Sequence, residues 1–343
     1  MATQIEALCA ALIVSGLFLY SAPARAQESP QTTEQPAAQT RAQRPPAKPD
    51  SPEVLAHIEK AKKIAGSVWP MEEKFLCENG HVANAADPGP VKLFDNLYAI
   101  PGTYGTGQGV IFILPTSDGL LMIDSGWQKD VDSVLLPGLK TLGFDPANIK
   151  LIILTHGHPD HYGGATYLQK HYGTHVMMSA ADWDFVTKPQ APRPGFGSLE
   201  PPMTDLIAVE GQAITLGDES VMPVNLPGHT PGSLGLIFPV KDHGQTHVVA
   251  MVGGGFVAPP QPEQTKQFIQ SLDHFEEWTK KMHADVELQN HPVMDGFGDK
   301  LVAVKARTSG QPNPFIVGQE NYTKFLEVMS ECAKATLARH QEQ

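Results

Sequence analysis

The chain has 343 residues, of which 41% are hydrophobic and 18% charged, and its formal net charge at neutral pH is −12. This is ordinary globular composition, long enough for one large α/β domain or two small ones. The acidic balance and the lack of a basic cluster argue against nucleic acid as a partner and leave a small-molecule substrate as the expectation.

An export signal is predicted in residues 1–26. The apolar stretch from Ala7 to Tyr20 is too short for a stable membrane-spanning helix, and Ala24-Arg25-Ala26 forms an A-x-A cleavage site. The segment before the apolar stretch carries Glu6 and no Lys or Arg, so a short membrane anchor is the alternative. We therefore expect a periplasmic or secreted protein that has no integral membrane span after cleavage.

A disordered linker is predicted next, in residues 27–52. It is rich in Pro, Gln and Ala and has no large apolar residue, so it cannot bury enough surface to offset the entropy of ordering. From residue 53 onward short apolar runs alternate with turn residues and amphipathic stretches, which predicts one α/β domain over residues 53–343.

The elements of this domain are expected in the following order. Strands are predicted at 93–100, 110–114, 120–123, 149–154, 175–178, 213–216, 221–226, 234–238, 247–252 and 286–288. Helices are predicted at 130–142, 163–172 and 322–338, and on the apolar face formed by Phe268, Leu272, Phe275 and Met282. The Pro-rich segment 189–202 is expected to be a loop.

Two cysteines, Cys77 and Cys332, would remain after signal cleavage. An exported protein could join them in a disulfide, but sequence separation does not give spatial distance. Cys332 also shares a helical apolar stripe with Phe325 and Met329, so a buried free thiol is equally open.

The strongest chemical signal is a group of metal-ligating residue types directly after a predicted buried strand. Gly157 and Pro159 predict a tight loop there rather than regular helix. Imidazole and carboxylate suit zinc, and four such groups are too many for one tetrahedral ion that keeps an open position. Two zinc ions sharing the loop are therefore predicted, against the alternative of a His-rich surface loop. The four residues are His156, His158, Asp160 and His161.

A second glycine-bracketed loop, Leu226-Pro-Gly-His-Thr-Pro-Gly-Ser233, also follows a predicted strand. On its own, His229 in this loop is more typical of a structural residue. Beside the first loop, it supplies the missing third nitrogen of one metal site.

The two loops together closely resemble the metallo-β-lactamase superfamily, and the resemblance covers roughly residues 93–292. It implies an α/β fold of four layers, an αββα sandwich, with the metals at the rim between two sheets. His156, His158 and His229 would hold the first zinc. Asp160 and His161 would begin the second site.

Groups of enzymes within this superfamily differ in the residue that completes the second site. Glyoxalase II-like enzymes and lactonases place a bridging Asp at the end of a late strand, and the first two lactamase subclasses use Cys. Here that strand, Val248-Val-Ala-Met-Val-Gly-Gly-Gly255, has neither. The third subclass has a late His followed by Pro, and His291-Pro292 resembles that pattern. His274 and His283 are alternatives, but both lie on a predicted helix, whereas His291 follows a strand.

Three more residues are predicted around the site. The resemblance implies that Asp124 orients a ligating imidazole, with a turn-capping Asp as the alternative. Lactamases of the third subclass usually have serine where this chain has Gly254, whose backbone N–H could still bind a substrate carboxylate; a simple turn is the alternative. Tyr104, between glycines, could line the pocket mouth or pack in the core.

Together these features predict a hydrolase, a monomer with two zinc ions per chain. A zinc pair lowers the pKa of a shared water from roughly 15.7 to roughly 7, and the hydroxide would attack a strained amide or ester carbonyl. Asp160 would be the catalytic residue that ligates and orients the nucleophile. A β-lactam is the expected substrate. The alternatives are a related zinc hydrolase acting on lactones, esters or other amides, and a metal-binding recognition module, which would have lost ligands.

Overall fold

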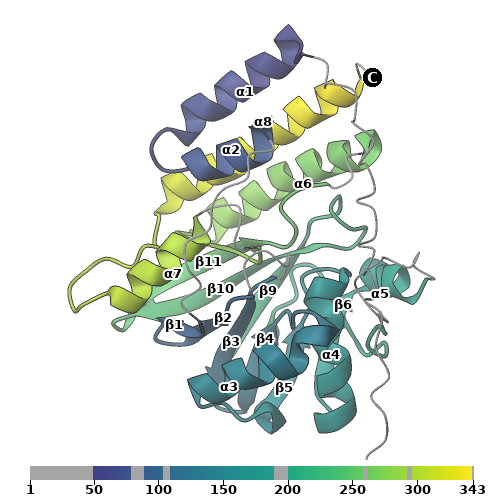
Figure 1. Ribbon diagram of the computed structural model, residues 1–343, viewed down its shortest axis with the longest axis vertical. Helices are drawn as coiled ribbons and strands as arrows, with labels where there is room; N and C mark the ends of the chain where they lie inside the picture. The colour runs from purple at the N-terminus through teal and green to yellow at the C-terminus, as the bar shows by residue number, and fades with distance from the viewer. Residues whose placement is uncertain are drawn as a thin grey trace, which may run out of the picture. The chain divides into compact units, whose positions relative to one another are not determined.

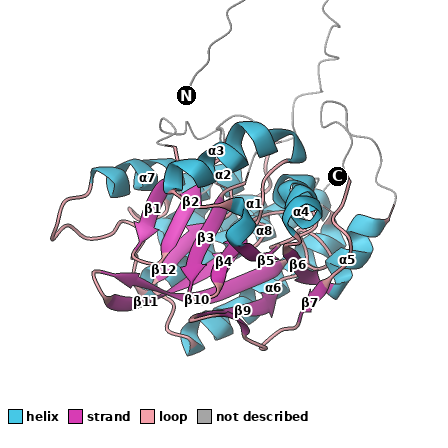
Figure 2. Cartoon of the chain, turned by 90° about the horizontal axis from the view of Figure 1, so that it is seen from below, coloured by secondary structure: helices cyan, strands magenta, loops and turns pink. Residues whose placement is uncertain are grey.

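Two β-sheets packed face to face form the centre of the protein in the computed structural model (Figure 1). The structure describes residues 49–78, 89–102, 109–188, 200–257, 261–291 and 296–341. Within these residues, helices cover the outer face of each sheet (Figure 2). The predicted αββα sandwich is confirmed. The predicted export signal, most of the predicted linker and Tyr104 lie outside the described residues.

The first sheet has seven strands in the order β1-β2-β3-β4-β5-β6-β7. The first four strands are antiparallel, and β4 to β7 run parallel, so β4 and β5 end at the same edge of the sheet. Its strands are β1 Val91–Phe94, β2 Leu97–Ile100, β3 Ile111–Thr116, β4 Gly119–Ile123, β5 Ile149–Ile153, β6 His175–Ser179 and β7 Leu206–Ala208.

The second sheet has five strands in the order β12-β11-β10-β9-β8. It is antiparallel except for β12, which runs parallel to β11. Its strands are β8 Ile214–Leu216, β9 Glu219–Asn225, β10 Leu234–Asp242, β11 Gln245–Val252 and β12 Val286–Gln289.

Apolar side chains of both sheets meet between them, as Phe112 of β3 and Leu236 of β10 illustrate. The first sheet is covered outside by η2 Val131–Leu135, α3 Leu136–Leu142, α4 Pro159–Tyr172 and α5 Ala180–Thr187. The second is covered by α6 Pro262–Lys281 and α8 Gln319–Gln341, and α1 Pro52–Ala65 and α2 Pro70–Glu78 pack on α8. The short segments η1 Gln128–Asp130, η3 Pro146–Asn148 and α7 Phe297–Ala306 complete the described elements.

The structure corrects two predicted elements and adds others. The strand predicted at 93–100 is the hairpin β1–β2, because Asp95 and Asn96 form a turn. The helix predicted at 130–142 begins with η1 and η2 before α3 and ends, as expected, at Gly143 in the left-handed region. The elements that were not predicted are α1, α2, η3, α5, β7 and α7.

A disulfide joins Cys77 of α2 to Cys332 of α8 across 255 residues of sequence. The pairing that the sequence left open is thus resolved in favour of the disulfide. A cross-link between such distant residues restricts the unfolded chain and stabilises the folded state by roughly 2–5 kcal/mol.

Ion pairs fix α1, and Asp50 two residues before it, to the same helix α8. Buried Glu331 accepts hydrogen bonds from His57 at 2.7 Å and from Lys60 at 3.0 Å. Arg339 binds Asp50 through two hydrogen bonds of 2.8 Å. Burial would raise the pKa of Glu331, but hydrogen bonds from His57, Lys334 and Lys60 lower it to about 2. Within the described residues, no helix combines the length and apolar character needed to cross a membrane.

Candidate metal centre

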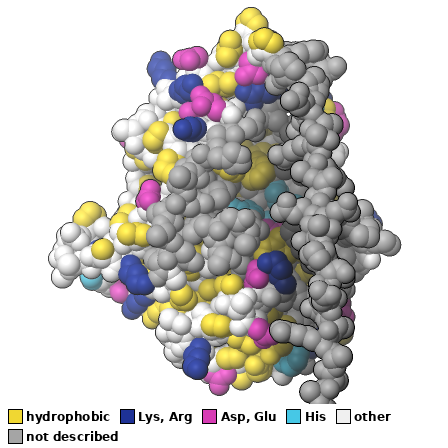
Figure 3. Space-filling model, in the orientation of Figure 1, with side chains coloured by type: hydrophobic (Ala, Val, Ile, Leu, Met, Phe, Trp, Pro, Cys, Tyr) yellow, Lys and Arg dark blue, Asp and Glu magenta, His cyan; other side chains and the backbone are white. Residues whose placement is uncertain are grey.

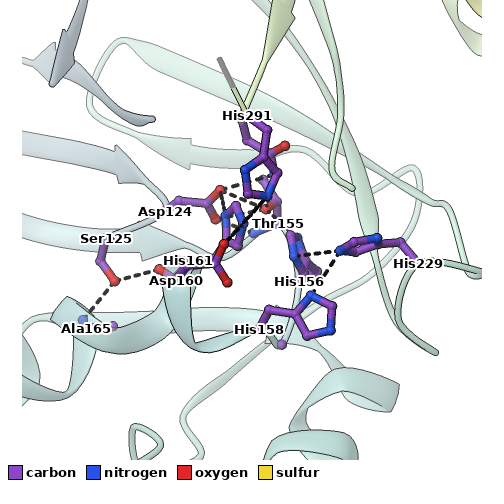
Figure 4. Close-up of polar contacts among 12 residues, drawn as sticks. Asp124, Ser125, Thr155, His156, His158, Asp160, His161, Ala165, His229 and His291 are labelled. Atoms are coloured by element: carbon purple, nitrogen blue, oxygen red, sulfur yellow. Dashed lines mark hydrogen bonds and ion pairs between the residues drawn. The ribbon is translucent and has the colours of Figure 1, made fainter. Parts of the chain in front are cut away.

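The residues predicted to bind metal converge at one edge of the sandwich, where several strands end (Figure 4). The loop after β5 carries His156 and His158, and the loop between β9 and β10 carries His229. His291 follows β12, and Asp124 follows β4. Two sheets therefore contribute to one site. Histidine side chains are visible near the centre of the face drawn in Figure 3, beside hydrophobic ones.

The first group of nitrogens belongs to His156, His158 and His229, whose ligand atoms lie within 4.8 Å of one another. The Nε2 atom of His229 lies 3.1 Å from Nε2 of His156 and 3.0 Å from Nδ1 of His158. Nitrogens bound at about 2.0–2.1 Å to a tetrahedral zinc ion would stand about 3.3 Å apart. The observed spacing is therefore close to that of a zinc site.

The second group consists of His161 and His291, with His156 shared between both groups. The Nε2 atoms of His161 and His291 lie 3.0 Å apart. The Oδ2 atom of Asp160 lies 3.4 Å from Nε2 of His161 and 3.6 Å from Nε2 of His291. The structure thus brings together all six side chains that the sequence singled out.

In three of the histidines, a hydrogen bond at Nδ1 orients the ring so that Nε2 faces the centre of the site. His229 donates through Nδ1 to the carbonyl of Phe256, and His161 donates through Nδ1 to Asp124 at 2.7 Å. The Thr155 hydroxyl donates to Asp124 at 2.8 Å and accepts from Nδ1 of His156 at 3.1 Å. In His156, His161 and His229, Nε2 is therefore the ring nitrogen that faces the centre, whereas His158 faces it through Nδ1.

Burial keeps several of these imidazoles neutral. Burial and the nearby His161 lower the pKa of His156 well below its ordinary value. Burial also lowers the pKa of His229, and burial together with His161 lowers the pKa of His291 to about 4. Their lone pairs are therefore available at neutral pH.

The His161–Asp160 pair behaves differently. Burial alone would lower the pKa of His161, but the carboxylates of Asp124 and Asp160 raise it to about 10. Burial would raise the pKa of Asp160, but His161 lowers it below its ordinary value. A metal ion binds the deprotonated imidazole nitrogen, so we expect metal binding here to release a proton.

The local structure of the first loop differs from the prediction. Pro159 does not prevent helix formation but begins α4, with His158 as the N-cap. Proline is well suited to the first helical position, where its missing N–H has no partner to lose. Asp160 and His161 therefore lie in the first turn of α4, where the helix dipole favours a carboxylate.

Asp124 holds this edge of the first sheet together from the end of β4. Its buried carboxylate accepts from His161, from the Thr155 N–H at 2.8 Å and from the Thr155 hydroxyl. Asn290 donates to Thr155 at 2.9 Å, which ties β12 to the same network. The backbone of Asp124 has a positive φ of 57°, an uncommon value for a residue other than glycine.

The end of β11 reaches the site but offers no ligand. A Cβ atom on Gly253 would lie 2.9 Å from Cβ of Thr155, and one on Gly254 would lie 2.5 Å from Cδ2 of His229. The Gly254 N–H, expected to be available to a substrate, donates to the carbonyl of Val252 at 3.1 Å. The backbone at position 254 lies so close to the His229 imidazole that a side chain would displace the ring, which explains why glycine is present there.

Gly254→Ser should weaken zinc binding rather than create an anchor for a substrate carboxylate. Gly254 has a φ of +106°, and its new side chain would displace the His229 ring. Gly310→Ser is the matched control, since Gly310 has a φ of +85° and open space around it. Competition with a chelator should show weaker zinc binding in the first variant only. Equal zinc affinity in both variants would contradict this account.

The other predicted candidates for the sixth ligand lie apart from the cluster. His274 on α6 bonds Glu210 at 3.0 Å, and neither it nor His283 is in a metal-ligating group of the described residues. The sequence analysis missed Asn290, Thr155 and the buried Asp182, which bonds both loops of the first group. The positions of Thr155 beside His156 and of Asn290 beside His291 could have indicated a role, whereas Asp182 is far from every ligand in sequence.

Apolar rings flank the first group. The Phe185 ring lies 6.2 Å from the His158 ring, and the Phe256 ring lies 5.9 Å from the His229 ring. Phe75 of α2 packs against Phe256 at 5.9 Å. A substrate at these histidines would therefore meet apolar side chains on two sides.

Comparison with known families and structures agrees with this geometry. The family model described as "Metallo-beta-lactamase superfamily" matches residues 104–243. A subclass B3 metallo-β-lactamase of Bradyrhizobium japonicum superimposes with a TM-score of 0.60 at 29% identity, over 72% of this chain and 92% of that one. A mutant metallo-β-lactamase of Legionella gormanii gives 0.63 at 20% identity, over 76% and 99%. The predicted resemblance is confirmed.

Curated relatives are hydrolases that match a shorter region. A hydroxyacylglutathione hydrolase of Haemophilus influenzae is 34% identical over 111 residues, 31% of this chain and 52% of that protein. A probable polyketide biosynthesis zinc-dependent hydrolase of Bacillus velezensis is 30% identical over 124 residues, 36% and 46% respectively. The chain spans about half the length of these relatives. The fold, the family match and the two histidine groups are thus similar to those of the metallo-β-lactamase superfamily, and the histidine groups could hold metal ions.

Proposed function

We propose that this protein hydrolyses β-lactams with two zinc ions per chain. The observation that carries the proposal is the make-up of the second group, in which His291 joins Asp160 and His161. The end of β11 lies against His229 with glycine only, so it supplies no bridging Asp and no Cys. This ligand set resembles the third lactamase subclass, and a structure of that subclass is 29% identical to the chain.

The residues of the chain would divide the work as follows. When bound, zinc supplies Lewis acidity and lowers the pKa of water. His156, His158 and His229 would hold one ion, and Asp160, His161 and His291 the other. The Asp160 carboxylate, 14% exposed, reaches toward both nitrogens of the second group and would orient the attacking water. The apolar rings of Phe185 and Phe256 would exclude bulk water from the substrate.

Export to the periplasm or beyond is part of the proposal. Its support is the predicted signal in residues 1–26 and the disulfide between Cys77 and Cys332. Structural disulfides persist in oxidising compartments and are rare in the cytosol.

A second candidate is hydrolysis of another acyl substrate, such as a thioester, an ester or a lactone. It is favoured by the hydroxyacylglutathione hydrolase of Haemophilus influenzae, 34% identical over 111 residues. It is also favoured by Gly254, which has no hydroxyl for the carboxylate of a β-lactam. The missing bridging Asp at the end of β11 argues against it.

The test combines metal content with substrate range. Protein purified without chelator should contain about two zinc ions per chain by elemental analysis. It should then be assayed with a cephalosporin, a carbapenem, an acyl-homoserine lactone and a hydroxyacylglutathione. The proposal is supported if a β-lactam has the highest kcat/KM of these four substrates. Two zinc ions without any β-lactam turnover would favour the second candidate, and one ion after zinc reconstitution would contradict the two-site assignment.

A further inference from the structure

A buried carboxylate lies between the two loops that carry the first group of histidines. It belongs to Asp182 in the first turn of α5, and the side chain is 0% exposed. Ser179, the N-cap of α5, accepts the Asp182 N–H at 3.1 Å through its hydroxyl oxygen. This bond caps the start of α5, and the Asp182 carboxylate has no part in the proposed reaction.

Both oxygens of Asp182 bind the loops. Oδ2 accepts the Gly157 N–H at 2.7 Å, and Gly157 stands between two of the histidines. The same oxygen accepts the Thr230 hydroxyl at 2.7 Å, and Thr230 directly follows His229. Oδ1 accepts the Gly232 N–H at 2.8 Å. One side chain thus connects the loop after β5 with the loop between β9 and β10.

The hydroxyls of Thr230 and Ser233 have defined hydrogen-bond directions beside Asp182. The Thr230 N–H donates to Oγ of Ser233 at 3.0 Å, and the two hydroxyl oxygens lie 2.7 Å apart. Because the Thr230 hydroxyl donates its proton to Asp182, the Ser233 hydroxyl donates to Thr230. A Cβ atom on Gly232 would lie 2.0 Å from the Ser179 hydroxyl oxygen, so the loop is pressed against α5.

We propose that Asp182 is a positioning residue that fixes the spacing of His158 and His229, and thereby sets the zinc affinity of the first group. The inference rests on the proposed function, in which that group holds zinc. Without Asp182 the two loops would have to become ordered when the metal binds, and this cost lowers the affinity. Residues that support metal ligands in this way typically change metal affinity about 10–100-fold.

The test measures zinc affinity of the folded protein, by competition with a chelator, in Asp182→Asn and Thr230→Val. Asparagine has one acceptor oxygen, so its NH₂ group would face an N–H donor of a loop. We expect zinc to bind the first group about 10–100-fold more weakly in Asp182→Asn. Thr230→Val removes one of the three loop contacts of Asp182, together with the acceptor for Ser233, and should shift affinity less, in the same direction. Cobalt(II) absorption should change in both variants, because the ligand geometry relaxes.

Asp285→Asn is the matched control. Asp285 accepts His247 at 2.7 Å and the Val248 N–H at 2.8 Å, near the start of β11 and away from Gly253 at its other end. This variant should lose stability without losing zinc affinity. The inference is overturned if Asp182→Asn binds zinc like the wild type, or if Asp285→Asn weakens binding equally. If Asp182→Asn does not fold, unchanged affinity in Thr230→Val overturns it. A wild-type protein that binds no zinc would overturn the proposed function as well.

Discussion

His291→Ala should reduce bound zinc from about two ions per chain to about one and lower kcat/KM by about 100-fold or more. The reason is geometric, because His291 supplies the nitrogen 3.0 Å from Nε2 of His161, and Asp160 faces both. Without it, the second group keeps one imidazole and one carboxylate. Elemental analysis after dialysis and steady-state kinetics would measure the two effects.

His274→Ala is the control for this experiment. His274 forms a pair with Glu210 at 3.0 Å, and its side chain is 41% exposed. An exposed pair contributes at most about 1 kcal/mol to stability, so zinc content and turnover should stay at wild-type values. If His274→Ala lost zinc and His291→Ala did not, the assignment of the sixth ligand would be wrong.

Asp124→Ala should have the largest effect on the folded state. It leaves the buried Thr155 N–H, the Thr155 hydroxyl and Nδ1 of His161 without their acceptor. Breaking such a buried pair costs roughly 3–5 kcal/mol. His161 would also lose the partner that orients its ring, so zinc affinity of the second group should fall. Chemical denaturation and chelator competition would measure the two losses.

Asp205→Ala separates loss of stability from loss of metal. Asp205 likewise accepts a histidine, His175, and a backbone N–H, that of Val176, both at 3.0 Å. Asp205 directly precedes β7, and its partners begin β6, so the contact is at the opposite strand end from the one that carries Asp124. Zinc affinity in the folded Asp205→Ala variant should therefore be unchanged. Equal zinc loss in both aspartate variants would show that Asp124 acts only through stability.

Most of the sandwich could be predicted from the sequence because buried strands are short apolar runs between turn residues. The run 149–154, for example, differs from β5 Ile149–Ile153 by one residue. Helix α1 was not predicted, because two of its four buried residues are Ala61 and Ala65, which give a weak apolar pattern. Strand β7 was missed because it has only three residues and one of them, Ile207, is 53% exposed.

The ligands could be predicted because their residue types are chemically specific and five of them lie in two short motifs. The residues that support them could not. Asp182 is 25 residues from Gly157 in sequence and 50 from Gly232, and an aspartate near a helix start has an ordinary capping interpretation. The predicted helix 163–172 began too late, because Gly157 and Pro159 were both interpreted as helix breakers, whereas α4 begins at Pro159.

The attachment of α1 and α2 to α8 has a consequence for the order of folding. The partners are far apart in the chain, as the 255 residues between Cys77 and Cys332 illustrate. During synthesis the two early helices therefore lack their main docking surface until α8 has emerged from the ribosome. Contacts between distant residues form slowly, because a long loop must close first. For the export proposed above, such a delay would be useful, because a chain whose outer helical layer assembles late stays unfolded for longer.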